Sequence, residues 1–75
     1  MIMTKTYILE DLDCAHCAAK IEEEVGKLEG VSKSTCTFLT QKLVVEIEDA
    51  KEKDVTKQIK KIVKKLEPDV EVFEQ

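Results

Sequence analysis

The amino-acid sequence predicts an α+β domain in which two helices cover one face of a four-stranded antiparallel sheet. Two segments carry apolar residues at three- and four-residue steps, the spacing of a helix with one buried stripe. Four shorter β-prone segments surround them in the order βαββαβ. The chain has 75 residues, which is room for a single domain over residues 1–75.

The first strand and the first helix are predicted on either side of a short acidic stretch. Thr6–Leu9 is β-prone and is followed by three acidic residues among positions 10–13. The helix is marked by apolar residues on one face: Ala18, Ile21, Val25 and Leu28. Gly30 is predicted to end it, since glycine is common at helix termini.

A pair of strands is predicted next, joined at Thr40-Gln41. The first strand places three side chains on the face toward the helices: Ser34, Cys36 and Phe38. The second alternates in the same way through Leu43, Val45 and Ile47. The connection lacks the Asn-Gly pair that is typical of tight hairpins.

The second helix is predicted to begin at a capping box and to end before a proline. Asp49 has the form of an N-cap with Glu52 as the reciprocating residue, and Pro68 stops the helix. Its buried stripe is Val55, Ile59, Ile62, Val63 and Leu66, and residues 69–73 form the last strand. Because neither helix can bury its stripe alone, both are expected on one face of the sheet, as in the ferredoxin-like fold.

Composition and charge exclude several classes of function. Twelve Lys and Arg residues against 16 Asp and Glu give a net charge of −4, whereas a nucleic-acid binder of this size would be basic. No run of 18 apolar residues is present, so no membrane insertion is expected. Met1–Lys5 is too short and polar for a secretory signal, which favours a cytoplasmic location. Only three aromatic residues contribute to the core, which disfavours an enzyme with a large closed pocket.

Cys14 and Cys17 form a Cys-x-x-Cys pair where the first strand leads into the first helix. Free amides and the positive end of a helix favour thiolate over thiol, and thiolates are soft metal ligands. Two sulfurs are fewer than the four ligands that Zn2+ usually takes, so the site is expected to be open. An odd total of three cysteines also argues against a disulfide framework.

The segment Leu12–Ala18, together with Leu28–Val31, resembles the heavy-metal-associated domain. That family includes soluble metallochaperones and the N-terminal domains of metal-exporting P-type ATPases. The resemblance extends from about Lys5 to Phe73. It implies the ferredoxin-like fold and a metal-ligand role for Cys14 and Cys17.

Asp13 is predicted to be the third ligand. Copper-binding members of the family commonly carry Gly-Met-Thr before the first cysteine, whereas this chain has Asp11-Leu12-Asp13. An aspartate at that point resembles the zinc-, cadmium- and lead-exporting branch. A divalent ion between two thiolates gains from an anionic oxygen, so Zn2+ or Cd2+ is expected, with Pb2+ or Cu+ as alternatives. The structural alternative for Asp13 is a loop or capping carboxylate.

Four further residues are of types that can bind a metal ion. His16 lies between the cysteines and is expected to face solvent, where it tunes local charge. Glu67 and Asp69 flank Pro68 in a loop that the resemblance places beside the metal loop, and either one could donate an oxygen. Cys36 is predicted to be a small core residue.

The predicted function is reversible capture and hand-over of the metal ion, without enzymatic chemistry. The expected partners are the ion and the transmembrane part or other domains of a metal-transporting ATPase, with the chain itself monomeric. Docking could use charge, since the second helix is lysine-rich at Lys57, Lys60, Lys61, Lys64 and Lys65. The sequence leaves open whether the chain is a free chaperone or an ATPase domain.

The sequence leaves two alternative functions open. The first is a Cu+ metallochaperone-type domain with the same fold. The second is a thiol–disulfide oxidoreductase, because a Cys-x-x-Cys pair with histidine inside it suits that chemistry. Oxidoreductases of the thioredoxin type place a cis-proline beside the active cysteine. The only proline of this chain, Pro68, is instead predicted to stop a helix, which argues against this alternative.

Overall fold

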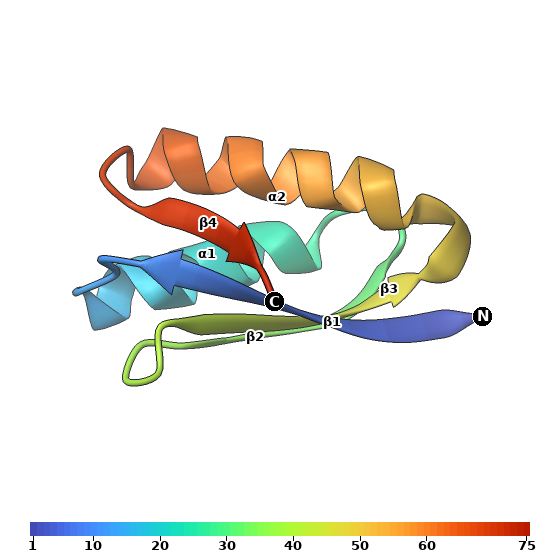
Figure 1. The fold of residues 1–75 in the computed structure, drawn as a ribbon, viewed down its shortest axis with the longest axis horizontal. Coiled ribbons are helices and arrows are strands. Elements are labelled where there is room, and N and C mark those ends of the chain that lie inside the picture. The colour runs from blue at the N-terminus through green and yellow to red at the C-terminus, as the bar shows by residue number, and fades with distance from the viewer.

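The structure, a computed structural model, describes all residues from Met1 to Gln75 as one layer of helices on one sheet (Figure 1). The sheet has the strand order β2-β3-β1-β4, and all neighbouring strands are antiparallel. This confirms the predicted ferredoxin-like arrangement. The elements are β1 (Ile2–Glu10), α1 (Ala15–Gly26), β2 (Val31–Thr37), β3 (Lys42–Glu48), a 3-10 turn η1 (Asp49–Lys51), α2 (Glu52–Leu66) and β4 (Glu71–Glu74).

The hydrophobic core lies between the sheet and the two helices. The central strands β1 and β3 pair so that Tyr7 lies opposite Leu43, and both are fully buried. The predicted stripes of both helices supply the other side of the core. The buried apolar residues are Tyr7, Leu9, Leu12, Ala18, Ile21, Val25, Leu43, Val45, Ile47, Val55, Ile59, Val63 and Val70.

The first strand is longer than the predicted Thr6–Leu9 segment. It begins at Ile2, because β3 offers partners from Ile2↔Glu48 through Ile8↔Lys42. The local sequence there is weakly apolar, so the pairing and not the strand's own pattern extends it. No helix in the structure is both long enough and apolar enough to cross a membrane.

The end of α1 differs from the prediction. The helix stops at Gly26, so Leu28 lies in the following turn, although it still packs against the core. Gly30 does not cap the helix but sits in that turn with φ of +95°, a conformation that favours glycine. A side-chain Cβ at Gly30 would come within 2.9 Å of Lys51 Cδ.

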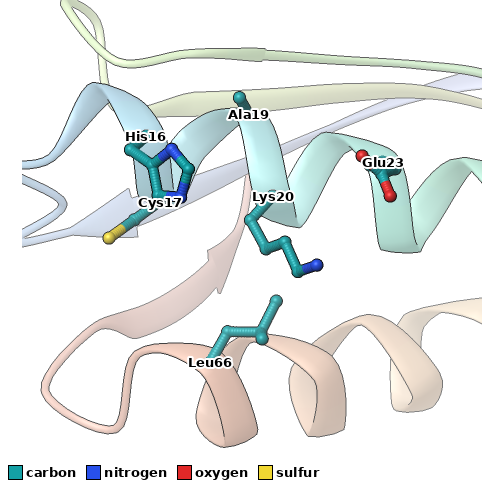
Figure 2. A pocket seen from close by; sticks show the side chains of 6 residues that line it. All are labelled: His16, Cys17, Ala19, Lys20, Glu23 and Leu66. Atoms are coloured by element: carbon teal, nitrogen blue, oxygen red, sulfur yellow. The ribbon is translucent and has the colours of Figure 1, made fainter.

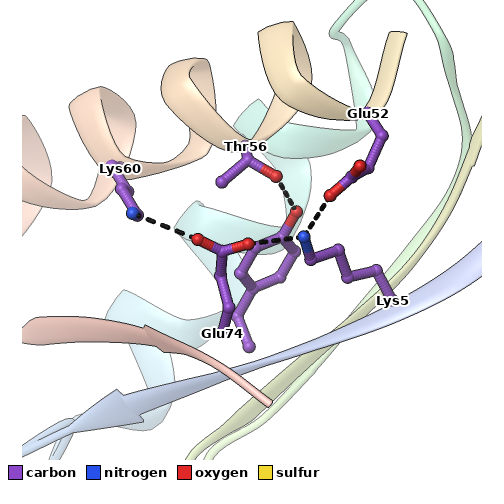
Figure 3. A network of polar contacts seen from close by, with 6 residues as sticks. Lys5, Glu52, Thr56, Lys60 and Glu74 are labelled. Carbon is purple, nitrogen blue, oxygen red and sulfur yellow. Dashed lines mark hydrogen bonds and ion pairs between the residues drawn. The ribbon is translucent and has the colours of Figure 1, made fainter. Parts of the chain in front are cut away.

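The predicted capping box at Asp49 and Glu52 is wrong. Asp49 opens the 3-10 turn, and no side chain caps either that turn or α2. The backbone N–H of Asp49 donates to Met1 O at 2.7 Å, while the Glu52 carboxylate pairs with Lys5 Nζ (Figure 3). The strand–helix ion pair therefore takes the carboxylate that the box required.

The other predicted boundaries lie close to the observed ones. Phe38 falls in the turn after β2 and not within the strand. The helix α2 ends at Leu66, two residues before Pro68. The last strand is Glu71–Glu74, which is shifted from the predicted residues 69–73 because it pairs with β1 only from Tyr7 to Glu10.

Candidate metal centre

Cys14 and Cys17 lie at the start of α1, as the sequence predicted. Cys14 is the N-cap residue, with an extended backbone, and its sulfur accepts the backbone N–H of Cys17 at 3.4 Å. A thiol thus takes the capping role that Ser, Thr, Asp or Asn usually fills. Both sulfur-bearing residues are half-buried, and the structure holds them side by side on one helical turn.

The loop that carries Cys14 is fixed from beneath. Leu12 is fully buried, and its backbone oxygen accepts a hydrogen bond from Gln41 Nε2 at 2.7 Å. Gln41 also accepts the N–H of Leu9 on its backbone oxygen at 2.8 Å. Gln41 stands at the β2–β3 turn with φ of +55°. The β2–β3 turn, 29 residues away in the sequence, therefore anchors the cysteine loop, a role for Gln41 that the sequence pattern did not predict.

The two thiols differ in acidity. A hydrogen bond between the side chains lowers the pKa of Cys14, and the backbone N–H of Cys17 lowers it further. The same side-chain bond raises the pKa of Cys17 to about 12, with desolvation and then the Glu67 carboxylate adding to the shift. Cys14 is therefore the more acidic thiol of the pair, and Cys17 is the one that keeps its proton to higher pH.

Three carboxylates were candidates for an oxygen ligand: Asp13, Glu67 and Asp69. Asp13 is exposed, and no three His, Cys, Asp or Glu side chains converge as a ready-made metal cluster. Glu67, just after α2, is half-buried and close enough to Cys17 to raise its pKa through a hydrogen bond and its charge. Asp69 is exposed in the same loop. The structure brings Glu67 to the thiols and leaves Asp13 on the solvent side of the loop.

His16 is exposed on the first turn of α1, and with Cys17 it lines a groove between the two helices (Figure 2). Across the groove lies Leu66, the last residue of α2. The third cysteine, Cys36, does not line this groove. Cys36 packs against the core from β2, and burial raises the pKa of its thiol to about 11.

The sequence is similar to a family of metal-binding domains and to several of its members. Residues 6–69 match the model of the heavy-metal-associated domain. The cadmium, zinc and cobalt-transporting ATPase of Bacillus subtilis (strain 168) is 34% identical over 71 residues, which cover 95% of this chain and 10% of that protein. The copper chaperone CopZ of Enterococcus hirae is 35% identical over 48 residues, covering 64% of this chain and 70% of the chaperone.

Solved structures agree with the fold. The solution structure of the N-terminal domain of ZntA in the Zn(II)-form superposes with a TM-score of 0.75 and 28% identity, covering 96% of this chain and 90% of that one. Because the family model spans most of the chain, the match concerns the whole domain and not only the cysteine loop. The chain belongs to the heavy-metal-associated domain family.

Proposed function

We propose that the chain binds one divalent soft metal ion, Zn2+ or Cd2+, through Cys14 and Cys17 and passes it on in metal transport. The observation that carries the proposal is the pair of adjacent sulfurs at an accessible helix end, with carboxylates on both sides. Asp13 precedes Cys14 directly, and Glu67 acts on Cys17. Either oxygen would complete a site for a divalent ion.

The charge balance favours a divalent ion over Cu+. Two thiolates neutralise two positive charges, and a carboxylate supplies the harder oxygen that Zn2+ accepts readily. The binding of Cu+ needs only soft sulfur ligands, so it would leave the carboxylates unused. We propose Asp13 as the third ligand, with Glu67 as the carboxylate next in line, and we assign no ligand role to His16 or Asp69.

The open site suits hand-over. A partner can add its own thiolates to an ion that this chain holds with few ligands, which a closed four-ligand site would prevent. The chain spans a tenth of the Bacillus subtilis transporter, so we propose that the partner is another part of such an ATPase. We place the exchange in the cytoplasm, where reduced thiols persist, and propose that the chain acts as a monomer without enzymatic chemistry of its own.

A competition titration of the reduced protein with Zn2+, Cd2+ and Cu+ tests the proposal. We expect Asp13→Ala to weaken Zn2+ and Cd2+ binding by about tenfold or more, which corresponds to about 1.4 kcal/mol per factor of ten, and to leave Cu+ binding unchanged. Glu67→Gln is measured alongside, and Asp69→Asn serves as the control from the same exposed loop.

The pattern of losses identifies the ligands. If only Glu67→Gln weakens binding of the divalent ions, the oxygen ligand is Glu67 and Asp13 is a loop residue. If neither variant weakens binding of the divalent ions and Cu+ binds far more tightly than Zn2+, the site is that of a Cu+ chaperone. The similarity to the copper chaperone CopZ makes this the second candidate function.

The oxidoreductase alternative is tested separately. A thiol–disulfide oxidoreductase would reduce an insulin disulfide catalytically through Cys14 and Cys17, whereas a metal carrier would not turn over. Membership of the heavy-metal-associated family favours the metal carrier.

A further inference from the structure

A groove leads away from the metal site between α1 and the end of α2 (Figure 2). Its volume is about 390 Å³, which is within the range of roughly 300–1,000 Å³ typical of small-molecule sites. Cys17, a proposed metal ligand, lines one end of it, so a molecule in the groove would lie next to the proposed metal site. The lining residues are His16, Cys17, Ala19, Lys20, Glu23 and Leu66.

The groove offers one positive and one negative side chain beyond the sulfur. Lys20 forms no ion pair, although seven other ion pairs are present in the chain. Glu23, one helical turn further along α1, contacts only the exposed Lys27 at 3.5 Å. Opposite them, Leu66 provides an apolar wall. Along the groove, the sulfur of Cys17 is therefore followed by the cation of Lys20 and then by the anion of Glu23.

We propose that this groove binds a low-molecular-weight zwitterionic thiol, an amino-acid-like molecule whose sulfur joins the metal ion held by Cys14 and Cys17. Its carboxylate would lie against Lys20 and its ammonium group against Glu23. The thiol binds as a thiolate: it releases its proton to solvent and replaces water on the ion. This inference rests on the proposed function, because without a bound metal ion the thiol has no partner in the groove.

The two charged side chains of the groove define the ligand class. An uncharged thiol could reach the ion but would leave Lys20 and Glu23 without new partners. A thiol with only one charge would satisfy one of them. Exposed ion pairs contribute about 0.2–1 kcal/mol each, so each matched charge should strengthen binding only by about 1.4- to fivefold.

The test is a titration of Cd2+-loaded protein with L-cysteine, cysteamine, 3-mercaptopropionate and 2-mercaptoethanol. The 113Cd resonance should move downfield as a third sulfur joins, while the backbone amides of Lys20 and Glu23 shift in the proton–nitrogen spectrum. We expect L-cysteine to bind most tightly. Its advantage over cysteamine, which lacks the carboxylate, should vanish in Lys20→Gln. Its advantage over 3-mercaptopropionate, which lacks the ammonium group, should vanish in Glu23→Gln.

Two matched variants control for general changes in charge. Lys33→Gln and Glu71→Gln alter exposed residues on strands outside the groove that form no ion pair, and they should keep both preferences. If all four thiols bind alike, or if the preferences survive in Lys20→Gln and Glu23→Gln, the inference is wrong while metal binding stands. Removal of Cd2+ by L-cysteine without a ternary complex would also overturn it. Failure of Cd2+ to bind Cys14 and Cys17 would overturn the proposed function as well.

Discussion

At the scale of single residues, the proposed metal site has two neighbouring cysteines of unequal acidity. Cys14 is the helix N-cap and receives hydrogen bonds, so its pKa falls. Cys17 donates to Cys14 and lies near the Glu67 carboxylate, so its pKa rises to about 12. A metal ion that binds both sulfurs must therefore displace the proton of Cys17. Consequently, metal affinity should fall as the pH is lowered.

This inequality predicts the order of alkylation in the reduced, metal-free protein. Because the thiolate is the reactive form, near neutral pH iodoacetamide should modify Cys14 before both Cys17 and Cys36, whose pKa values are raised to about 12 and about 11. Raising the pH should speed up the modification of Cys17, and peptide mass spectrometry would follow each site. Glu67→Gln should raise the alkylation rate of Cys17 and leave the alkylation rate of Cys36 unchanged. Equal rates at Cys14 and Cys17 would contradict the predicted inequality.

At the scale of elements, a polar network attaches α2 to the strands beneath it (Figure 3). Tyr7 Oη on β1 and Thr56 Oγ1 on α2 form a buried hydrogen bond of 2.6 Å. Beside it, Lys5 pairs with both Glu52 and Glu74, which joins β1 to α2 and β4. This network therefore fixes the first part of α2 against the strands β1 and β4.

The buried hydroxyl pair gives a prediction for stability. Tyr7→Phe keeps the ring but leaves the Thr56 hydroxyl buried without a partner, so unfolding should become easier by about 1–3 kcal/mol. Urea denaturation monitored by circular dichroism measures the change. In the double variant Tyr7→Phe/Thr56→Val both polar groups are gone, and the loss should be smaller than the sum of the single losses. Additive losses would show that the two hydroxyls act independently.

At the scale of the whole molecule, stability depends on a thin core. Thirteen buried apolar residues serve a chain of 75 residues, for which about 4–11 kcal/mol of total stability is typical. A metal ion that binds only the folded state adds about 2.7 kcal/mol when its free concentration is 100 times Kd. The free energy that a bound metal ion adds should therefore be a large fraction of the domain's free energy of unfolding.

Ile59→Ala tests this balance. Ile59 is fully buried on α2, and its truncation should cost about 2–5 kcal/mol through lost contacts and a cavity. Saturating Cd2+ should restore part of that loss, measured as the urea midpoint with and without the ion. The same addition should not stabilise Cys14→Ser/Cys17→Ser. Stabilisation of that double variant by Cd2+ would place the binding site elsewhere.

Much of the fold could be predicted from local sequence because the helices and strands differ in period. The stripe from Val55 to Val63 repeats at helical steps, and Leu43, Val45 and Ile47 alternate, so each pattern identifies its element and its buried face. Boundaries were less accurate. The start of β1 at Ile2 depends on pairing with β3, and Glu52 bonds to Lys5 instead of capping a helix. Both depend on residues more than 40 positions away in the sequence.

By itself, the sequence determined the antiparallel α+β fold and the adjacency of Cys14 and Cys17, because both follow from spacings of a few residues. Only the tertiary structure decided what surrounds those sulfurs. It brought Glu67 to Cys17, placed Gln41 beneath the loop and opened the groove toward Leu66. The physical reason is that these neighbours come from separate elements. Their distances are set by the packing of the helices on the sheet, and no local sequence pattern encodes that packing.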